Sequence, residues 1–357
     1  MLFPDPTSQW KILAQRLVRG LGVRAGELIQ IHDEAGEFEL LREVILAVEL
    51  AGATPLVEIR PIQHMHTLWN RAPQSYLANW DKHRADLMRR TDRILTLLGT
   101  PPDYTKLPLE RFQMWRSAES RLTEIEESRP RPYLIAAIPT ADHAERLGIS
   151  YEQLAAHIFP ALNLTLLEMQ KVLQTVLFKL EKSQTITIRT GKSAELTLKQ
   201  GQRRWLTDDG YIDAEDIAAG AVVSNLPAGS LYTTVLEDQT SGTLYLREAL
   251  GAIGVTFHFE QGRVQRIDAL ANGDAIQSIF THHTGEPCRV GHIGIGLNPR
   301  LRRPIGWTIV DEHVNGHLFI SFGENRYMGG ENASSLNIDF ALPNAQLFAD
   351  GNQVIPS

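Results

Sequence analysis

Residues able to do chemistry are concentrated between Gly291 and Asp339. His292 lies in a glycine-spaced run that ends at Asn298-Pro299, and Asn337 and Asp339 stand two apart in an alternating run. Because side chains two apart on a strand point to the same face, Asn337 and Asp339 should lie side by side. An imidazole near such a pair outlines a metal site, since two histidines and one carboxylate suit non-haem iron(II).

The outline is incomplete, because the neutral amide of Asn337 is a poor ligand for iron or zinc. His317 offers a replacement imidazole, since it stands two residues before Phe319 on an expected strand and should face the same way. The alternatives are a metal site rescued by His317 and a site without metal. The basic run with Arg300 and Arg302 is either a solvated loop or an anchor for a carboxylate, which the fork of arginine suits.

Composition limits the class of protein. The chain has 357 residues, 43% apolar and 22% charged, as in globular proteins. Its formal net charge of −7 argues against a nucleic-acid groove. No apolar run approaches the ~20 residues of a membrane span, and the first residues lack the features of a signal peptide. With a single cysteine, Cys288, a disulfide within the chain and a cysteine-based zinc site are excluded. We therefore expect a cytoplasmic protein that binds neither nucleic acid nor membrane.

Residues 1–183 are predicted to form an α/β, Rossmann-like domain with a parallel sheet, because apolar runs alternate with helical patterns. Strands are expected at residues 28–32, 55–59, 93–98 and 133–138. Helices are expected from Ser8 to Gly20, over 37–50, over 63–90 with a loop at Ala72-Pro73, over 109–127, and over 151–182 with a kink or break at Pro160. The first turn from strand to helix, residues 33–36, has one glycine and two acids, so nucleotide binding is not expected.

Residues 184–357 are predicted to form a mainly antiparallel β domain. Apolar and polar residues alternate at 185–189, 195–199 and 255–259, and glycine turns separate these runs. A helix is expected near residues 272–280. This domain contains every residue that the chemistry above singles out.

Several pieces of the second half carry a resemblance to a known family. They are Asn225–Gly229, Asp238–Gly242, Gly291–Pro299, Asp311–Gly323 and Gly329–Asp339. In these pieces the chain resembles the thermophilic-type metallo-aminopeptidases, the aminopeptidase T and S family, and even more their mononuclear-iron relatives, the 2,5-dihydroxypyridine dioxygenases. The layout agrees over nearly the whole chain. The resemblance implies an aminopeptidase T-like fold and a homodimer.

The resemblance also implies metal positions that this chain mostly lacks. In the aminopeptidases two glutamates, a histidine and a His-x-Asp pair bind the metals, and they fall at Ser230, His292, Phe319, Asn337 and Asp339. Only Asp339 keeps its ligand type there, so a two-metal site is not expected. In the dioxygenases the three iron ligands fall at His292, Asn337 and Asp339, and one imidazole is missing. Metal binding by His292 and Asp339 is therefore expected to be vestigial.

Two functions remain open. The first is a pseudoenzyme without cofactor, which binds a peptide and presents a precursor peptide to tailoring enzymes of a natural-product pathway. Its ligand-binding residues would be Ser230, His292, Arg300, Arg302, His317, Phe319 and Asn337. The second is an enzyme with one iron or zinc ion, either a ring-cleaving dioxygenase or a metallo-aminopeptidase. We favour the first, because losing one imidazole of three costs more metal affinity than an amide returns.

Overall fold

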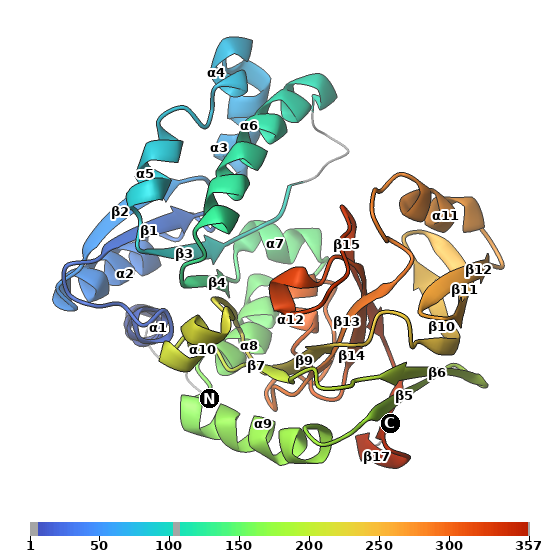
Figure 1. Cartoon of the computed structure of the whole chain (residues 1–357). Coiled ribbons are helices and arrows are strands. Elements are labelled where there is room, and N and C mark those ends of the chain that lie inside the picture. The colour runs from blue at the N-terminus through green and yellow to red at the C-terminus, as the bar shows by residue number, and fades with distance from the viewer. Residues whose placement is uncertain (1–5, 103–107, 356–357) are drawn as a thin grey trace. The chain divides into compact units, whose positions relative to one another are not determined.

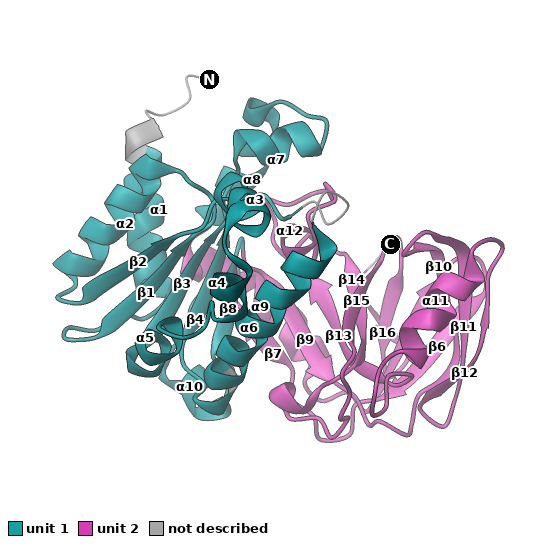
Figure 2. Ribbon diagram, turned by 90° about the horizontal axis from the view of Figure 1, so that it is seen from above, with its two compact units in different colours: residues 1–164, 210–227 teal, residues 165–209, 228–357 magenta. Residues whose placement is uncertain are grey.

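The chain folds into two compact units, each made of two stretches of sequence. A computed structural model describes residues 6–102 and 108–355 (Figure 1). Unit 1 contains residues 1–164 and 210–227, and unit 2 contains residues 165–209 and 228–357 (Figure 2). The division differs from the single boundary expected at residue 183, because the chain crosses between units after residues 164, 209 and 227.

Unit 1 is a parallel sheet with helices, which confirms the predicted α/β fold. Its strand order is β2-β1-β3-β4-β8. The strands are β1 (Leu28–Asp33), β2 (Thr54–Ile59), β3 (Arg93–Leu98), β4 (Tyr133–Ala137) and β8 (Val223–Leu226). The helices are α1 (Pro6–Gly20), α2 (Phe38–Leu50), α3 (Ile62–Arg71), α4 (Gln74–Ala78), α5 (Arg84–Arg90), α6 (Leu109–Ser128), α7 (Ala141–Arg146), α8 (Tyr151–Leu162) and α10 (Ala214–Ala219). The near-continuous burial of β1 and β3 is typical of strands covered on both faces.

Helix boundaries differ from the prediction in three places. The tract expected over 63–90 breaks at Ala72-Pro73 as predicted, and it breaks again between Ala78 and Arg84. Helix α1 begins at Pro6, so Ser8 lies inside it rather than capping it. The long helical tract breaks after Leu162, and Pro160 lies within α8. The break is set by Thr165, whose hydroxyl accepts the Glu168 N–H at 3.3 Å while the Glu168 carboxylate accepts the Thr165 N–H at 3.1 Å. This reciprocal capping box starts a new helix, α9 (Leu166–Leu180).

The crevice where open parallel sheets usually bind ligands is closed in unit 1. Such crevices form at the carboxyl ends of strands where the strand order reverses, here between β1 and β3. The backbone N–H groups of Glu34 and Ala35 both donate to the Leu97 carbonyl at 3.0 Å. A Cβ at Gly99 would lie 2.5 Å from the Glu34 carbonyl oxygen. The chain after β1 and the chain after β3 are thus in direct contact at this point.

Unit 2 is mainly antiparallel β, as the alternating sequence predicts, and its strands form two sheets. A seven-stranded sheet has the order β12-β11-β10-β6-β5-β16-β17, and a five-stranded sheet has the order β15-β14-β13-β9-β7. The first contains β5 (Thr185–Thr190), β6 (Ala194–Lys199), β10 (Ser241–Ala249), β11 (Ala252–Glu260), β12 (Arg263–Asp268), β16 (Gln346–Ala349) and β17 (Asn352–Ile355). The second contains β7 (Leu206–Asp208), β9 (Ser230–Thr234), β13 (Val290–Gly296), β14 (Leu318–Gly323) and β15 (Asn337–Leu342). All strand pairs in both sheets are antiparallel.

The core of unit 2 joins the two sheets through aromatic rings. Phe257 of β11 lies 5.2 Å, between ring centroids, from Phe322 of β14, and Phe280 of α11 (Gly273–Thr281) lies 5.4 Å from Phe322. Unit 2 also contains the short helices α12 (Thr308–Asp311) and η2 (Arg326–Met328). In the described ranges, no helix of either unit combines the length and apolar character needed to cross a membrane.

Candidate functional site

One face of the five-stranded sheet collects most of the residues that the sequence singled out. Gly294 pairs with Phe319, Gly296 pairs with Ser230, and Ser321 pairs with Asp339. Alternate residues of a strand share a face, so the register shows which residues lie on the same side of the sheet. We call this side the site face. It contains Asp208, Ser230, His292, Gly294, Gly296, Phe319, Ser321, Asn337 and Asp339. The opposite face carries apolar side chains such as Ile293, Ile295 and Phe322, which are buried.

His292 of β13 and Asp339 of β15 are in contact on the site face, although β14 lies between their strands. Their Nε2 and Oδ1 atoms lie 3.2 Å apart, and the Asp339 side chain is 32% exposed. The register of β13 shifts between Val290 and Ile293, so His292 lies in a β-bulge, a feature that redirects side chains next to functional sites. The Nδ1 atom of His292 is buried and has no hydrogen-bond partner in the described part of the chain.

Phe319 fills the space next to this pair. Its ring packs edge-on against the His292 imidazole, with 5.9 Å between the centroids. The ring lies directly over Gly294, where an added Cβ would collide with it. Glycine at position 294 is therefore what admits the ring. A buried apolar group thus occupies the position to which the resemblance assigns a metal-binding histidine.

Asn337 is held away from the imidazole by other partners. The Ser321 hydroxyl donates to Asn337 Oδ1 at 3.2 Å, and Asn337 Nδ2 donates to the Tyr327 hydroxyl at 3.4 Å. Ser230 is buried, and it stands opposite both Gly296 and Asp208 in the sheet. These residues offer neutral amide and hydroxyl groups rather than metal ligands.

Glu312 adds an unusual carboxyl group to the site face. A Cβ at Gly296 would lie 2.6 Å from the Glu312 carbonyl oxygen, so the residues after α12 pack directly on β13. Burial, reinforced by the carboxylates of Asp339, Asp208 and Asp311, raises the pKa of Glu312 to about 8. Glu312 therefore holds a proton at neutral pH.

The two histidines near Glu312 differ in their surroundings. His313 is fully buried, with Nε2 3.7 Å from Asp208 Oδ2, and burial lowers its pKa to about 4. His317 is half-buried just before β14, and its carbonyl accepts the Gly296 N–H at 2.8 Å. Burial also lowers the pKa of His317. Among the residues described, no hydrogen bond or ion pair links the His317 ring to Asp339.

The two candidate arginines lie away from this cluster. Arg300 and Arg302 are exposed in the loop after β13. The Arg300 guanidinium lies 3.6 Å from the Glu168 carboxylate of α9, and both side chains are about half exposed. Screened, exposed pairs of this kind contribute little to stability. The structure does not bring either arginine to the contact between His292 and Asp339.

The donor set on the site face does not fit a resident iron or zinc ion. His292 and Asp339 supply one imidazole and one carboxylate, whereas catalytic iron and zinc sites use at least three protein ligands. Within residues 6–102 and 108–355, no three His, Cys, Asp or Glu side chains are grouped so that they could hold a metal.

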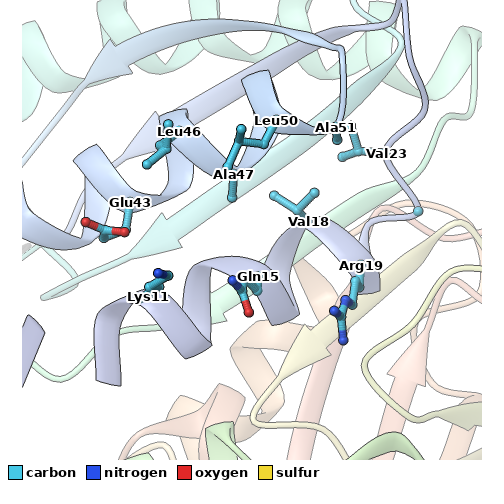
Figure 3. Close-up of a pocket in the computed structure, with 11 residues that line it drawn as sticks. Lys11, Gln15, Val18, Arg19, Val23, Glu43, Leu46, Ala47, Leu50 and Ala51 are labelled. Carbon is cyan, nitrogen blue, oxygen red and sulfur yellow. The ribbon is translucent and has the colours of Figure 1, made fainter. Parts of the chain in front are cut away.

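A groove in unit 1 contains none of the predicted site residues. It lies between α1 and α2 and has a volume of about 500 Å³ (Figure 3). Leu46 and Leu50 of α2 line it and are exposed, while Lys11 and Arg19 of α1 form its basic side. Nothing in the structure shows what covers this groove.

Sequence reasoning missed the acidic residues Glu312 and Asp208, as well as Ser321, whose hydroxyl bonds to Asn337. Glu312 lies within the stretch from Gly291 to Asp339, but its raised pKa depends on how it packs in the tertiary structure. Asp208 ends a strand of three residues, which is too short to show an alternating pattern. No sequence signal in the neighbourhood of Asp208 could have identified it.

Comparison with known proteins agrees with this architecture. The sequence model of the thermophilic metalloprotease (M29) family matches residues 8–353. AmpT from Thermus thermophilus has a similar structure, with a TM-score of 0.72, 16% identity, and coverage of 98% of this chain and 99% of AmpT. The 2,5-dihydroxypyridine dioxygenase from Pseudomonas putida gives a TM-score of 0.62 at 16% identity, with coverage of 99% and 97%. At these identities the likeness shows the fold alone.

A sequence match points to the same relatives. The chain is 24% identical over 155 residues to the 2,5-dihydroxypyridine 5,6-dioxygenase of Pseudomonas putida. This match covers 36% of the chain and 42% of the dioxygenase, so it spans about two fifths of that relative.

Proposed function

The chain belongs to the thermophilic metalloprotease (M29) family, and we propose that it binds the free amino terminus of a peptide without a metal ion and without cleaving it. The observation that carries the proposal is the chemistry of the site face. At the positions of Ser230, Phe319 and Asn337 the side chains are a hydroxyl, an aromatic ring and a neutral amide, none of which is a good metal ligand. What remains is a surface that pairs polar groups with one buried aromatic ring.

The charge on the site face favours a cationic ligand group. Burial, together with the carboxylates of Asp339 and Asp208, raises the pKa of Glu312, so these two carboxylates repel an ionised Glu312. An ammonium group placed among them would relieve this repulsion, and partial burial would strengthen the attraction. A peptide amino terminus supplies such a cation.

Binding without cleavage leaves the peptide intact for other enzymes. We therefore propose that the natural ligand is a precursor peptide, which the protein presents to tailoring enzymes of a natural-product pathway. We further propose that it does so as a homodimer in the cytoplasm. Gel filtration with light scattering tests the dimer, and the tailoring rate measured with and without the protein tests the presentation.

Metal analysis and calorimetry test the proposed function directly. Protein purified without chelator and soaked with iron(II) or zinc should contain far less than one metal ion per chain. A peptide with a free amino terminus should bind at least about tenfold more tightly than its acetylated form, which corresponds to about 1.4 kcal/mol. One tightly held metal per chain, or release of the first residue of the peptide, would contradict the proposal.

A mononuclear-iron enzyme is the second candidate. The 3.2 Å contact between His292 and Asp339 and the sequence match to a dioxygenase favour it. It requires about one iron per chain and consumption of oxygen in the presence of a dihydroxypyridine. His292→Ala should then remove the iron, whereas His282→Ala, at an exposed histidine outside the site face, should retain it.

A further inference from the structure

The strand that carries Asn337 and Asp339 has an open edge. β15 lies at the end of the five-stranded sheet, and in the described part of the chain β14 is the one strand that pairs with it. Asn337, Asp339 and Ala341 are exposed, whereas Phe340 and Leu342 are buried. The outer side of β15 is therefore a template on which a further strand could pair.

A backbone hydrogen bond shows which groups point outward from this edge. The Glu324 N–H donates to the Leu336 carbonyl at 2.7 Å, just before β15 begins. Residues of an antiparallel pair alternate between bonding to the neighbour and pointing away from it. In the register that pairs Gly323 with Asn337, the residues at 338, 340 and 342 therefore bond to β14. The N–H and C=O groups of Asn337, Asp339 and Ala341 point outward.

The hydrogen bonds between β13 and β14 agree with this assignment. The Gly323 N–H donates to the Arg289 carbonyl at 2.9 Å, on the side of β13. The Gly296 N–H donates to the His317 carbonyl at 2.8 Å. Both bonds imply that the backbone groups of residues 319, 321 and 323 of β14 bond to β13. Residues 318, 320 and 322 are then left to bond to β15.

The residues with outward backbone groups are the same ones whose side chains lie on the site face. We infer that the bound peptide adds to β15 as a further strand and so extends the site face. This inference rests on the peptide-binding function proposed above. The outward groups of Asn337, Asp339 and Ala341 offer three donors and three acceptors over about 13 Å, the rise of four strand residues.

The other edges of these sheets are protected in ways that β15 is not, and β8, at the far edge of the parallel sheet, has only 4 residues. β2 contains Pro55, and β12 carries Arg263, Arg266 and Asp268. β7 and β17 have only 3 and 4 residues. Short length, proline and basic side chains are the usual means of blocking an edge. β15 has none of them, and its one charge, Asp339, complements the amino terminus of a peptide.

The ligand side of the test uses hexapeptides with a free amino terminus and a fluorophore at the carboxyl end. Each backbone amide is methylated in turn, which removes one donor at a time. In an added strand every second N–H faces β15, so methylation at alternate positions should lower the affinity about tenfold. Methylation at the intervening positions should change it less than about twofold. Equal effects at all positions would overturn strand addition while leaving peptide binding intact, and no binding of any hexapeptide would overturn both proposals.

The protein side of the test uses Ala341→Pro, with Ala341→Val as its matched control. Proline removes an outward N–H that does not bond to β14, so the sheet should still form. Binding should weaken about tenfold in the proline variant and change little in the valine variant, which keeps the N–H. If proline instead converts a dimer to a monomer and leaves peptide affinity unchanged, the edge holds a second copy and the inference is wrong. Should the proline variant misfold, the methylated peptides still decide the question.

Discussion

Glu312 should make the protein less stable as the pH rises. In the unfolded chain its carboxyl ionises near the ordinary value of 4.5, whereas burial and three neighbouring carboxylates raise the pKa to about 8 in the folded state. Between these values the folded state binds a proton that the unfolded state has lost. The free energy of unfolding therefore falls with increasing pH across this window and is lowest, for this group, above about pH 8.

The size of the effect follows from the same two values. Each pKa unit corresponds to about 1.4 kcal/mol, so the span from 4.5 to about 8 amounts to about 5 kcal/mol. Glu312→Gln keeps the shape of the side chain and cannot ionise. The variant should match the wild type near pH 5 and should be more stable than it by up to about 5 kcal/mol near pH 9.

Urea unfolding of both proteins in steps from about pH 5 to 9 measures this difference. Subtracting the variant from the wild type removes the contribution of other groups that titrate. Glu248→Gln, on an exposed side chain of β10, is the matched control and should follow the wild type at every pH. If the stability difference between wild type and Glu312→Gln does not grow between about pH 5 and 8, the burial of Glu312 beside the other carboxylates has been misjudged.

Three further predictions concern the site face. Phe319→His should place a second imidazole beside His292 and Asp339 and give about one zinc per chain after dialysis, measured by atomic absorption, whereas Phe319→Leu should bind no more zinc than wild type. Gly294→Ala should lower the free energy of unfolding, measured in urea, by about 1–3 kcal/mol, because its Cβ would collide with the Phe319 ring. In a Phe319→Ala background the same substitution should lower it by less, and an equal loss in both backgrounds would argue against the collision. Asp339→Asn should weaken binding of a peptide with a free amino terminus about tenfold in calorimetry and leave the acetylated peptide unaffected, and an equal loss for both would count against an ammonium contact.

Most of the fold could be predicted because its elements have strong local patterns. The helix over Phe38–Leu50 and the strand over Arg93–Leu98 occur at or within one residue of the predicted positions. β8 was missed, since four residues show no periodicity and its place is set by pairing with β4. The end of α8 was misplaced because the capping box at Thr165 decides the boundary, while Pro160 is accommodated inside the helix.

The site was predictable where strand alternation alone decides geometry. Asn337 and Asp339 share a face, as their spacing requires. The contact of His292 with Asp339 could not be derived from spacing, because it depends on the order of β13, β14 and β15 and on the bulge at His292. Glu312 acquires its raised pKa through burial and through carboxylates from other parts of the chain, and no local pattern indicates either.

Because each unit is made of two separate stretches of sequence, neither unit can be expressed or exchanged as one continuous fragment. The fifth strand of the parallel sheet, β8, is synthesised only after β5, β6 and β7 of the other unit. A gene fragment ending at residue 183 therefore encodes a sheet whose last strand is missing, with β4 exposed at its edge. The two units cannot be exchanged between relatives by a single cut, so recombination has to replace both stretches of a unit together.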